Sequence, residues 1–130
     1  MLLIRTSNRE RLTADTVPPG YPASSVGRFR IRTDGTARFD RHYHHVAELW
    51  FVAAGAGTVA IGDQQVSVTA GDILHTPAGT DHDIVAVRQE LLVFWWTAPL
   101  PDGVSGAHLY RTTEQATKHL VTVDRESSHA

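Results

Sequence analysis

The stretch HYHHVAELWFVAAG, residues 42–55, places three histidines in four positions directly before a run with the composition of a buried strand. His42 and His44 are two residues apart, so in an extended chain both imidazoles project from one face. Glu48 follows after three residues, which is enough for a turn that brings the chain back alongside. Two imidazoles and a carboxylate on one face are typical ligands of a metal ion. The alternative is that the histidines lie at the surface and Glu48 is a solvated turn residue.

The composition excludes several classes of protein. With 130 residues, 42 % of them hydrophobic and 20 % charged, the chain has the balance of one globular domain. A net charge of −2 gives no reason to expect nucleic acid or an anionic membrane as a partner. No run approaches the roughly 20 apolar residues of a membrane span, and residues 1–10 carry charge too early for a signal peptide. The absence of cysteine excludes thiolate metal sites, and we expect a cytoplasmic protein.

From residue 26 onward, short β-rich runs alternate with glycine and aspartate turn signals. The runs are GRFRIRT (27–33), ARFDRHYH (37–44), ELWFVA (48–53), TVAI (58–61), QQVSVT (64–69), ILHTP (73–77), HDIVAV (82–87) and LLVFWWTA (91–98). This spacing is typical of an antiparallel sandwich or barrel. The AGAG run at 54–57 is expected to be one of the turns. Only residues 112–120, TTEQATKHL, have a helical pattern, with Thr112 and Gln115 spaced as in a capping box.

The chain divides into three expected regions. Residues 1–25 include VPPGYPASS, whose three prolines favour a strand and loop that pack on the barrel. Residues 26–98 are expected to form the barrel core. Residues 99–130 are expected to form a C-terminal extension that frays at ESSHA, residues 126–130.

Two stretches resemble the two motifs of the cupin superfamily. The first motif, G(X)5HXH(X)3–4E(X)6G, is matched by Gly35, His42, His44, Glu48 and Gly55, and the second, G(X)5PXG(X)2H(X)3N, by Gly71, Pro77, Gly79 and His82. Two departures are one extra residue after Gly35 and Ala86 in place of the asparagine, and neither touches a ligand position. The resemblance implies an all-β fold, an antiparallel jelly-roll (cupin) barrel with a short peripheral helix at most.

The resemblance also implies one divalent transition metal ion inside the barrel. Its ligands would be His42, His44, Glu48 and His82, whereas the strand pleat turns His45 to the opposite side. Small cupins can lose the metal and keep the barrel, but they usually lose ligands when they do, and this chain retains all four. Imidazole and carboxylate accept iron, manganese, nickel, cobalt, copper or zinc, so the identity of the ion stays open. Four protein ligands on an octahedral ion leave two positions for water, substrate or dioxygen.

Other residues are candidates for the substrate pocket. Trp50 and Trp96 are expected to form an aromatic wall, or else to be plain core residues. Arg28, Arg30 and Arg32 alternate with apolar residues and share one strand face. This row would bind a carboxylate if it faced the barrel mouth, and it would be solvated if it lay on an outer face.

His75 lies among apolar residues in the strand before the Pro77–Gly79 turn. It is the candidate catalytic residue, as a proton carrier, with a hydrogen-bonded core histidine as the alternative. The cupin resemblance implies a metal-dependent enzyme acting on a small organic molecule, either an oxygenase or a metal-assisted isomerase, cyclase or lyase. The alternative is a non-catalytic small-molecule-binding module. A metal-free sugar epimerase is disfavoured, because such enzymes replace the metal ligands that this chain retains.

The strands ELWFVA and LLVFWWTA are apolar on both faces, apart from Glu48. A barrel strand with a solvated outer face should alternate apolar and polar residues. We therefore expect the outer face to be covered by a second subunit in a homodimer, or else by the N- or C-terminal segment of the same chain.

Overall fold

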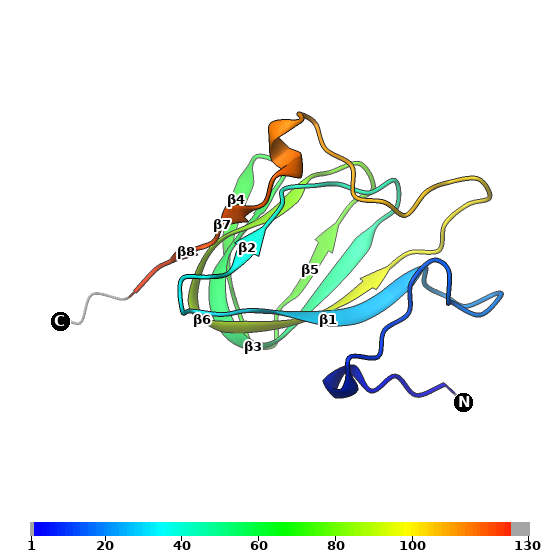
Figure 1. Cartoon of the computed structure of the whole chain (residues 1–130), viewed down its shortest axis with the longest axis horizontal. Helices are drawn as coiled ribbons and strands as arrows, with labels where there is room; N and C mark the ends of the chain where they lie inside the picture. The colour runs from blue at the N-terminus through cyan, green and yellow to red at the C-terminus, as the bar shows by residue number, and fades with distance from the viewer. Residues whose placement is uncertain (1, 126–130) are drawn as a thin grey trace.

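The computed structural model of the chain describes residues 2–125 and consists mainly of antiparallel strands (Figure 1). The elements in chain order are η1 (Thr6–Asn8), β1 (Ser25–Ile31), β2 (Arg38–Phe39), β3 (Glu48–Ile61), β4 (Gln64–Thr69), β5 (Ile73–Thr76), β6 (His82–Thr97), η2 (Glu114–Ala116), β7 (His119–Leu120) and β8 (Thr122–Val123). The 3-10 turns η1 and η2 lie outside the barrel strands. The predicted all-β, antiparallel barrel is therefore confirmed.

Two long strands form most of the barrel wall. The main sheet has the order β1-β6-β3-β4, with β5 paired to β3 and β8 paired in parallel to β6. A second, two-stranded sheet joins β2 to β7. In Figure 1, β3 and β6 curve around the interior. This curvature closes the sheets into a jelly-roll barrel.

The expected turn at 54–57 is wrong, because these residues lie inside β3. HDIVAV and LLVFWWTA are likewise parts of the single strand β6. The β3–β6 register shifts between Val52 and Ala54 and again between Ala56 and Gly57, so the strand bends through bulges. Gly55 has a φ of 89°, and a Cβ there would lie 2.0 Å from the Glu90 carbonyl oxygen. The glycines therefore bend one long strand instead of ending it.

The expected helix at 112–120 is also wrong. Within it only Glu114–Ala116 form a 3-10 turn, and His119–Leu120 form β7. The Thr112 hydroxyl does accept a hydrogen bond from the Gln115 N–H at 3.4 Å, as a capping box requires. Pairing of β7 with β2 then holds the following residues extended, so tertiary contacts override the local preference.

The interior is apolar and follows the alternation of the strands. Its buried cluster consists of Ile31, Trp50, Val52, Val59, Val68, Ile84, Val87, Leu91, Val93 and Val121. Full burial of one such aliphatic side chain stabilises the fold by about 1.5–3 kcal/mol. No helix among the described residues is long and apolar enough to cross a membrane.

The outer face of β3, β5 and β6 carries a second apolar surface. Phe51 of β3 pairs with Phe94 on one side and Ile73 on the other, and Leu49 pairs with Trp96. Phe51 is 38 % exposed and Ile73 is 62 % exposed. Within residues 2–125, the terminal segments of the chain thus leave part of this surface uncovered.

The flanking segments pack against the barrel. Leu12 forms an antiparallel bridge with Val26, and the Ser24 hydroxyl donates a hydrogen bond to the Ala98 carbonyl at 2.7 Å. After β6, Leu109 forms an antiparallel bridge with Tyr43, which stands between His42 and His44 in the sequence. In Figure 1 this segment, yellow to orange, crosses one end of the barrel. The expected fraying at 126–130 falls outside the described residues.

Candidate metal centre

Backbone pairing brings the two histidine motifs together. His42 and His82 form an antiparallel bridge in which each N–H donates to the other's carbonyl, at 3.2 and 2.8 Å. The N–H of Gly79 donates to the His44 carbonyl at 2.8 Å, which ties the turn before His82 to the first motif. Glu48 begins β3, where it pairs with both β5 and β6. Residues distant in sequence are therefore fixed around one point.

The four predicted ligands converge inside the barrel. Nε2 of His42 lies 2.9 Å from Nε2 of His82, and that His82 atom lies 3.3 Å from Oε2 of Glu48. Donor atoms of His44, Glu48 and His82 lie within 4.8 Å of one another. Two ligands at right angles, each about 2.1 Å from an ion, are separated by about 3 Å. His44, Glu48 and His82 therefore form one group that could hold a metal ion, and His42 adjoins it through His82 and belongs to a second such group with His44 and His108.

Hydrogen bonds orient the two facing imidazoles. Nδ1 of His42 donates to the Asp40 carbonyl at 2.6 Å, which leaves the Nε2 lone pair directed into the barrel. Nδ1 of His82 lies 3.3 Å from the Thr76 hydroxyl. A partner on the far nitrogen is the usual support of a metal-binding histidine.

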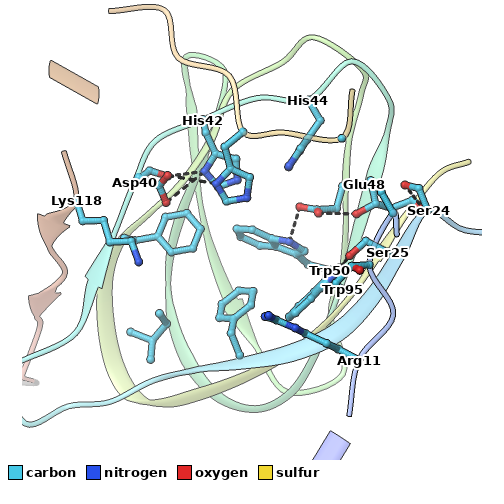
Figure 2. A pocket seen from close by; sticks show the side chains of 18 of the residues that line it. Arg11, Ser24, Ser25, Asp40, His42, His44, Glu48, Trp50, Trp95 and Lys118 are labelled. Carbon is cyan, nitrogen blue, oxygen red and sulfur yellow. Dashed lines mark hydrogen bonds and ion pairs between the residues drawn. The ribbon is translucent and has the colours of Figure 1, made fainter. Parts of the chain in front are cut away.

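Glu48 is held on both oxygens (Figure 2). Oε1 accepts a hydrogen bond from the Thr97 hydroxyl and Oε2 accepts one from the Trp50 indole N–H, each at 2.8 Å. These donors fix the carboxylate in the orientation that faces His82. The arrangement matches a metal-ligating carboxylate with its own hydrogen-bond support.

Burial sets the ionisation of the site. It lowers the pKa of His44 to about 4 and that of His82 to about 2, with neighbouring imidazoles adding to both effects. Burial raises the pKa of Glu48 to about 7, although its two hydrogen bonds act in the opposite direction. The histidines are therefore neutral at physiological pH, which is the form that binds metals.

A cavity of about 520 Å³ adjoins these ligands. Its apolar wall is formed by Phe29, Ile31, Phe39, Trp50 and Trp95. Four cationic side chains also line it, Arg11, Arg30, Arg38 and Lys118, of which Arg30 forms an ion pair with Glu90. In Figure 2, Lys118 lies beside Asp40 and Arg11 lies on the other side of the cavity, below Trp50 and Trp95, so cationic side chains flank the cavity at separate positions.

The structure places one of the two candidate wall residues at the cavity and the other outside it. Trp50 lines the cavity, but Trp96 lies on the outer face beside Leu49, and Trp95 lines the cavity instead. Trp95 pairs with Gly27, where a Cβ would lie 2.4 Å from the indole ring. The glycine therefore gives the ring its space on the inner face.

The arginine row lies on the outer side of β1. Arg28, Arg30 and Arg32 line a second cavity of about 610 Å³ next to η1, whose lining includes none of the four predicted ligands. Arg30 forms an ion pair with Glu90 at 2.8 Å and reaches the rim of the main cavity. The solvated alternative thus fits Arg28 and Arg32 better than a role in the pocket.

His75 and His45 both lie outside the cavity. His75 is exposed and pairs with Leu49 on the outer face, in conflict with its expected place as a proton carrier in the pocket. The physical reason is strand alternation, because Leu74 and Thr76 take the inward positions of β5. His45 is exposed, and the two groups of possible metal ligands in the described residues do not include it.

Sequence reasoning missed three residues beside the histidines. Asp40 is buried and accepts a hydrogen bond from the Tyr110 hydroxyl at 2.5 Å, and its Oδ2 lies 3.3 Å from Nδ1 of His108. Burial alone would raise the pKa of Asp40, but these partners and His42 lower it below its ordinary value. The polar residues His108 and Tyr110 alternate with Leu109, a pattern that indicates one polar face of an extended segment. The sequence does not show that this segment pairs with the first motif, because the pairing depends on long-range contacts.

Comparisons with known proteins agree with this architecture. A family model described as "Cupin domain" matches residues 29–97. An uncharacterized protein, y4oW, from Sinorhizobium fredii is 31 % identical over 96 residues, which are 74 % of this chain and 39 % of that protein. The chain thus spans well under half the length of this curated relative.

Solved structures show the same fold at low sequence identity. A cupin 2 conserved barrel domain protein from Rhodopseudomonas palustris has a TM-score of 0.61 at 18 % identity, covering 76 % of this chain and 64 % of that one. A cupin protein from Bacteroides fragilis has a TM-score of 0.54 at 18 % identity, covering 67 % and 73 %. A predicted oxalate decarboxylase from Thermotoga maritima has a TM-score of 0.54 at 21 % identity, covering 61 % and 69 %.

Proposed function

The chain belongs to the cupin family, and we propose that it is a metal-dependent enzyme acting on a small organic molecule in the cavity beside the metal site. The residues that would hold the ion are His42, His44, Glu48 and His82. The observation that carries the proposal is the 2.9 Å separation of the His42 and His82 Nε2 atoms, with Glu48 at 3.3 Å. Two neutral imidazoles in such contact share a proton as a hydrogen bond, and an ion in place of that proton would be bound by both Nε2 lone pairs.

Bound there, a divalent transition ion supplies Lewis-acid or oxygen chemistry, depending on its identity. The protein's own contribution is orientation. Asp40 holds the His42 ring through its carbonyl, and Thr97 and Trp50 hold the Glu48 carboxylate. The apolar wall excludes water from the substrate body and lowers the local dielectric constant, which strengthens charge interactions in the site.

The cavity favours an anionic substrate, which we propose to be a small carboxylic acid. Arg11, Arg38 and Lys118 line it, and none of the three forms an ion pair with a residue in 2–125. The acidic residues of the lining, Asp40 and Glu48, already accept hydrogen bonds from neighbours. A carboxylate paired with one of these cations would leave the rest of the molecule in the cavity beside the metal ligands.

The outer apolar face supports assembly as a homodimer. Phe51 and Ile73 are exposed next to each other in the register, and Phe94 extends the same surface. Two copies of such a face would bury it in a two-fold interface, the commonest kind of assembly.

Metal content tests the proposed site. The protein should bind about one ion per chain, and a His44→Ala, His82→Ala double variant should lose it because both imidazoles belong to the ligand set. A His45→Ala, His75→Ala variant is the matched control, since both of these histidines are exposed outside the cavity. Equal metal content in the two double variants would contradict the site.

Substrate turnover separates the enzyme from the alternative, a non-catalytic binding module. The metal-loaded protein should convert a member of a panel of small carboxylic acids, with loss of conversion in the His44→Ala, His82→Ala variant. Saturable, metal-dependent binding of such an acid without any product would assign the chain to the binding module.

A further inference from the structure

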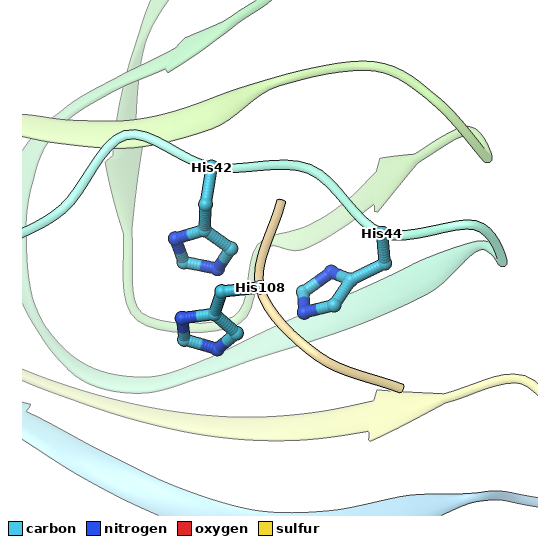
Figure 3. Close-up of side chains that lie close together, drawn as sticks. All are labelled: His42, His44 and His108. Atoms are coloured by element: carbon cyan, nitrogen blue, oxygen red, sulfur yellow. The ribbon is translucent and has the colours of Figure 1, made fainter. Parts of the chain in front are cut away.

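A fourth histidine lies at the metal site, although it belongs to neither sequence motif. The His108 ring stacks on the His42 ring, with centroids 3.7 Å apart and an interplanar angle of 4° (Figure 3). Donor atoms of His42, His44 and His108 lie within 4.8 Å of one another. The site therefore has a second three-nitrogen group, which shares two members with the set proposed above.

The backbone that follows His108 is held by contacts that do not involve an ion. The next residue, Leu109, exchanges two backbone hydrogen bonds with Tyr43, both 2.9 Å long. Arg111 donates to Asp81 at 2.8 Å, and its guanidinium carbon lies 4.1 Å from the centroid of the Tyr43 ring. This part of the C-terminal segment is therefore bound directly to the connection between β2 and β3 that carries His42 and His44.

Asp40 orients His108 as it orients His42. Nδ1 of His108 lies 3.3 Å from Asp40 Oδ2, while Nδ1 of His42 lies 3.5 Å from Oδ1 of the same carboxylate. Figure 3 shows both rings with their nitrogens on corresponding sides. A carboxylate on Nδ1 favours the tautomer that leaves Nε2 with its lone pair, which is the arrangement of a metal ligand.

We propose that His108 is a fifth protein ligand of the metal, supplied by the C-terminal segment. This inference rests on the proposed metal site, because His42 and His44 are shared. On an octahedral ion it leaves one position for substrate where the four motif ligands alone would leave two. The other three imidazoles are buried, but the His108 side chain is 47 % exposed and has room to turn toward the ion or away from it. It is therefore the ligand that an incoming carboxylate would displace.

Replacement of His108 by phenylalanine separates ligation from packing. Phenylalanine keeps an aromatic ring against His42 but offers no lone pair. His108→Ala removes both functions, and His45→Ala is the control for loss of an exposed histidine nearby. Each apo variant is first compared with the wild type by circular dichroism and thermal unfolding, and His108→Asn serves if the phenylalanine variant does not fold.

The measurements use Cu²⁺, whose high affinity for nitrogen ligands and unpaired electron make it a suitable probe. Competition with a chelator should show that both His108→Phe and His108→Ala bind Cu²⁺ at least about tenfold more weakly than the wild type. Loss of a residue that only supports a ligand already lowers metal affinity by about 10- to 100-fold. Electron paramagnetic resonance should show one fewer nitrogen ligand in both variants. His45→Ala should match the wild type in both measurements.

The outcomes separate this inference from the proposed site. If His108→Phe retains wild-type affinity and nitrogen count while His44→Ala, His82→Ala abolishes binding, the metal site stands and His108 is not a ligand. If the wild type binds no ion, or if the double variant binds Cu²⁺ as tightly as the wild type, both proposals are wrong.

Discussion

In the metal-free protein, the stability of Glu48→Gln relative to the wild type should be greater at pH 8 than at pH 5. The same substitution should remove much of the metal affinity. Burial raises the pKa of Glu48 from its ordinary value of 4.5 to about 7. The folded apo protein thus takes up a proton at Glu48 between these two values, whereas the unfolded chain does not. The stabilisation from neutral Glu48 is complete below pH 4.5 and is lost as pH rises through 7.

The size of this effect follows from the shift. A pKa difference of this size corresponds to about 3 kcal/mol in the free energy of unfolding, at about 1.4 kcal/mol per pKa unit. Glutamine cannot ionise, so the variant lacks this loss at high pH. The glutamine amide N–H₂ would face a hydrogen-bond donor, either the Thr97 hydroxyl or the Trp50 indole N–H. This unmatched contact lowers the free energy of unfolding by about 1–3 kcal/mol at every pH.

The assay is denaturant unfolding of both proteins with a chelator present, at pH 5 and pH 8. The difference in free energy of unfolding should move in favour of Glu48→Gln by about 2.5 kcal/mol between these two pH values, because part of the shift lies below pH 5. Titration of the buried histidines affects both proteins similarly and largely cancels in this comparison. With metal added at pH 8, the order should reverse, because an ionised Glu48 ligand stabilises only the wild type.

Two results would refute the reasoning. A pH dependence that is the same in the wild type and in Glu48→Gln would show that Glu48 does not titrate between pH 5 and 8 in the folded protein. Equal stabilisation of the two proteins by metal would show that the carboxylate is not a ligand.

Three other changes test the cavity, the outer face and the core. Arg11→Ala with Lys118→Ala should weaken the binding of small carboxylates at least about tenfold by calorimetry, since each lost charge-assisted hydrogen bond contributes about 1.5–3 kcal/mol. Arg28→Ala should have little effect, and equal losses in both variants would exclude a specific role for the cations of the cavity. Ile73→Asp should convert a dimer to a monomer by light scattering at micromolar concentration, and a monomeric wild type would contradict the interface. Leu91→Ala should lower the free energy of unfolding by about 2–5 kcal/mol, because Leu91 is fully buried, and a loss below 1 kcal/mol would place it outside a tightly packed core.

The fold was predictable because two motifs with fixed spacing lie within a chain of strand-like runs. The convergence of His42 with His82 depends on a single backbone bridge, and that bridge joins the two motifs that carried the resemblance. The predicted element boundaries were wrong where the same local composition is found both in turns and in bent strands. Gly55 has the composition of a turn, yet it bends β3 because β6 passes directly over its backbone.

The cavity wall was harder to predict than the ligands. Strand alternation places Trp95 and Trp96 on opposite faces but does not say which face is inside. Bulges in β3 and β6 change the phase, and the small residue opposite Trp95, Gly27, decides the outcome. His108 and Asp40 meet only because the C-terminal segment returns to the first motif, which no local pattern specifies.

The most direct test of the metal centre is anomalous diffraction from crystals of the metal-loaded protein, measured at the absorption edge of the bound ion. One anomalous peak should lie inside the barrel, with Nε2 of His42, donor nitrogens of His44 and His82 and an oxygen of Glu48 about 2.0–2.3 Å from it. A peak elsewhere, for example at the exposed His45 or His75, would contradict the account.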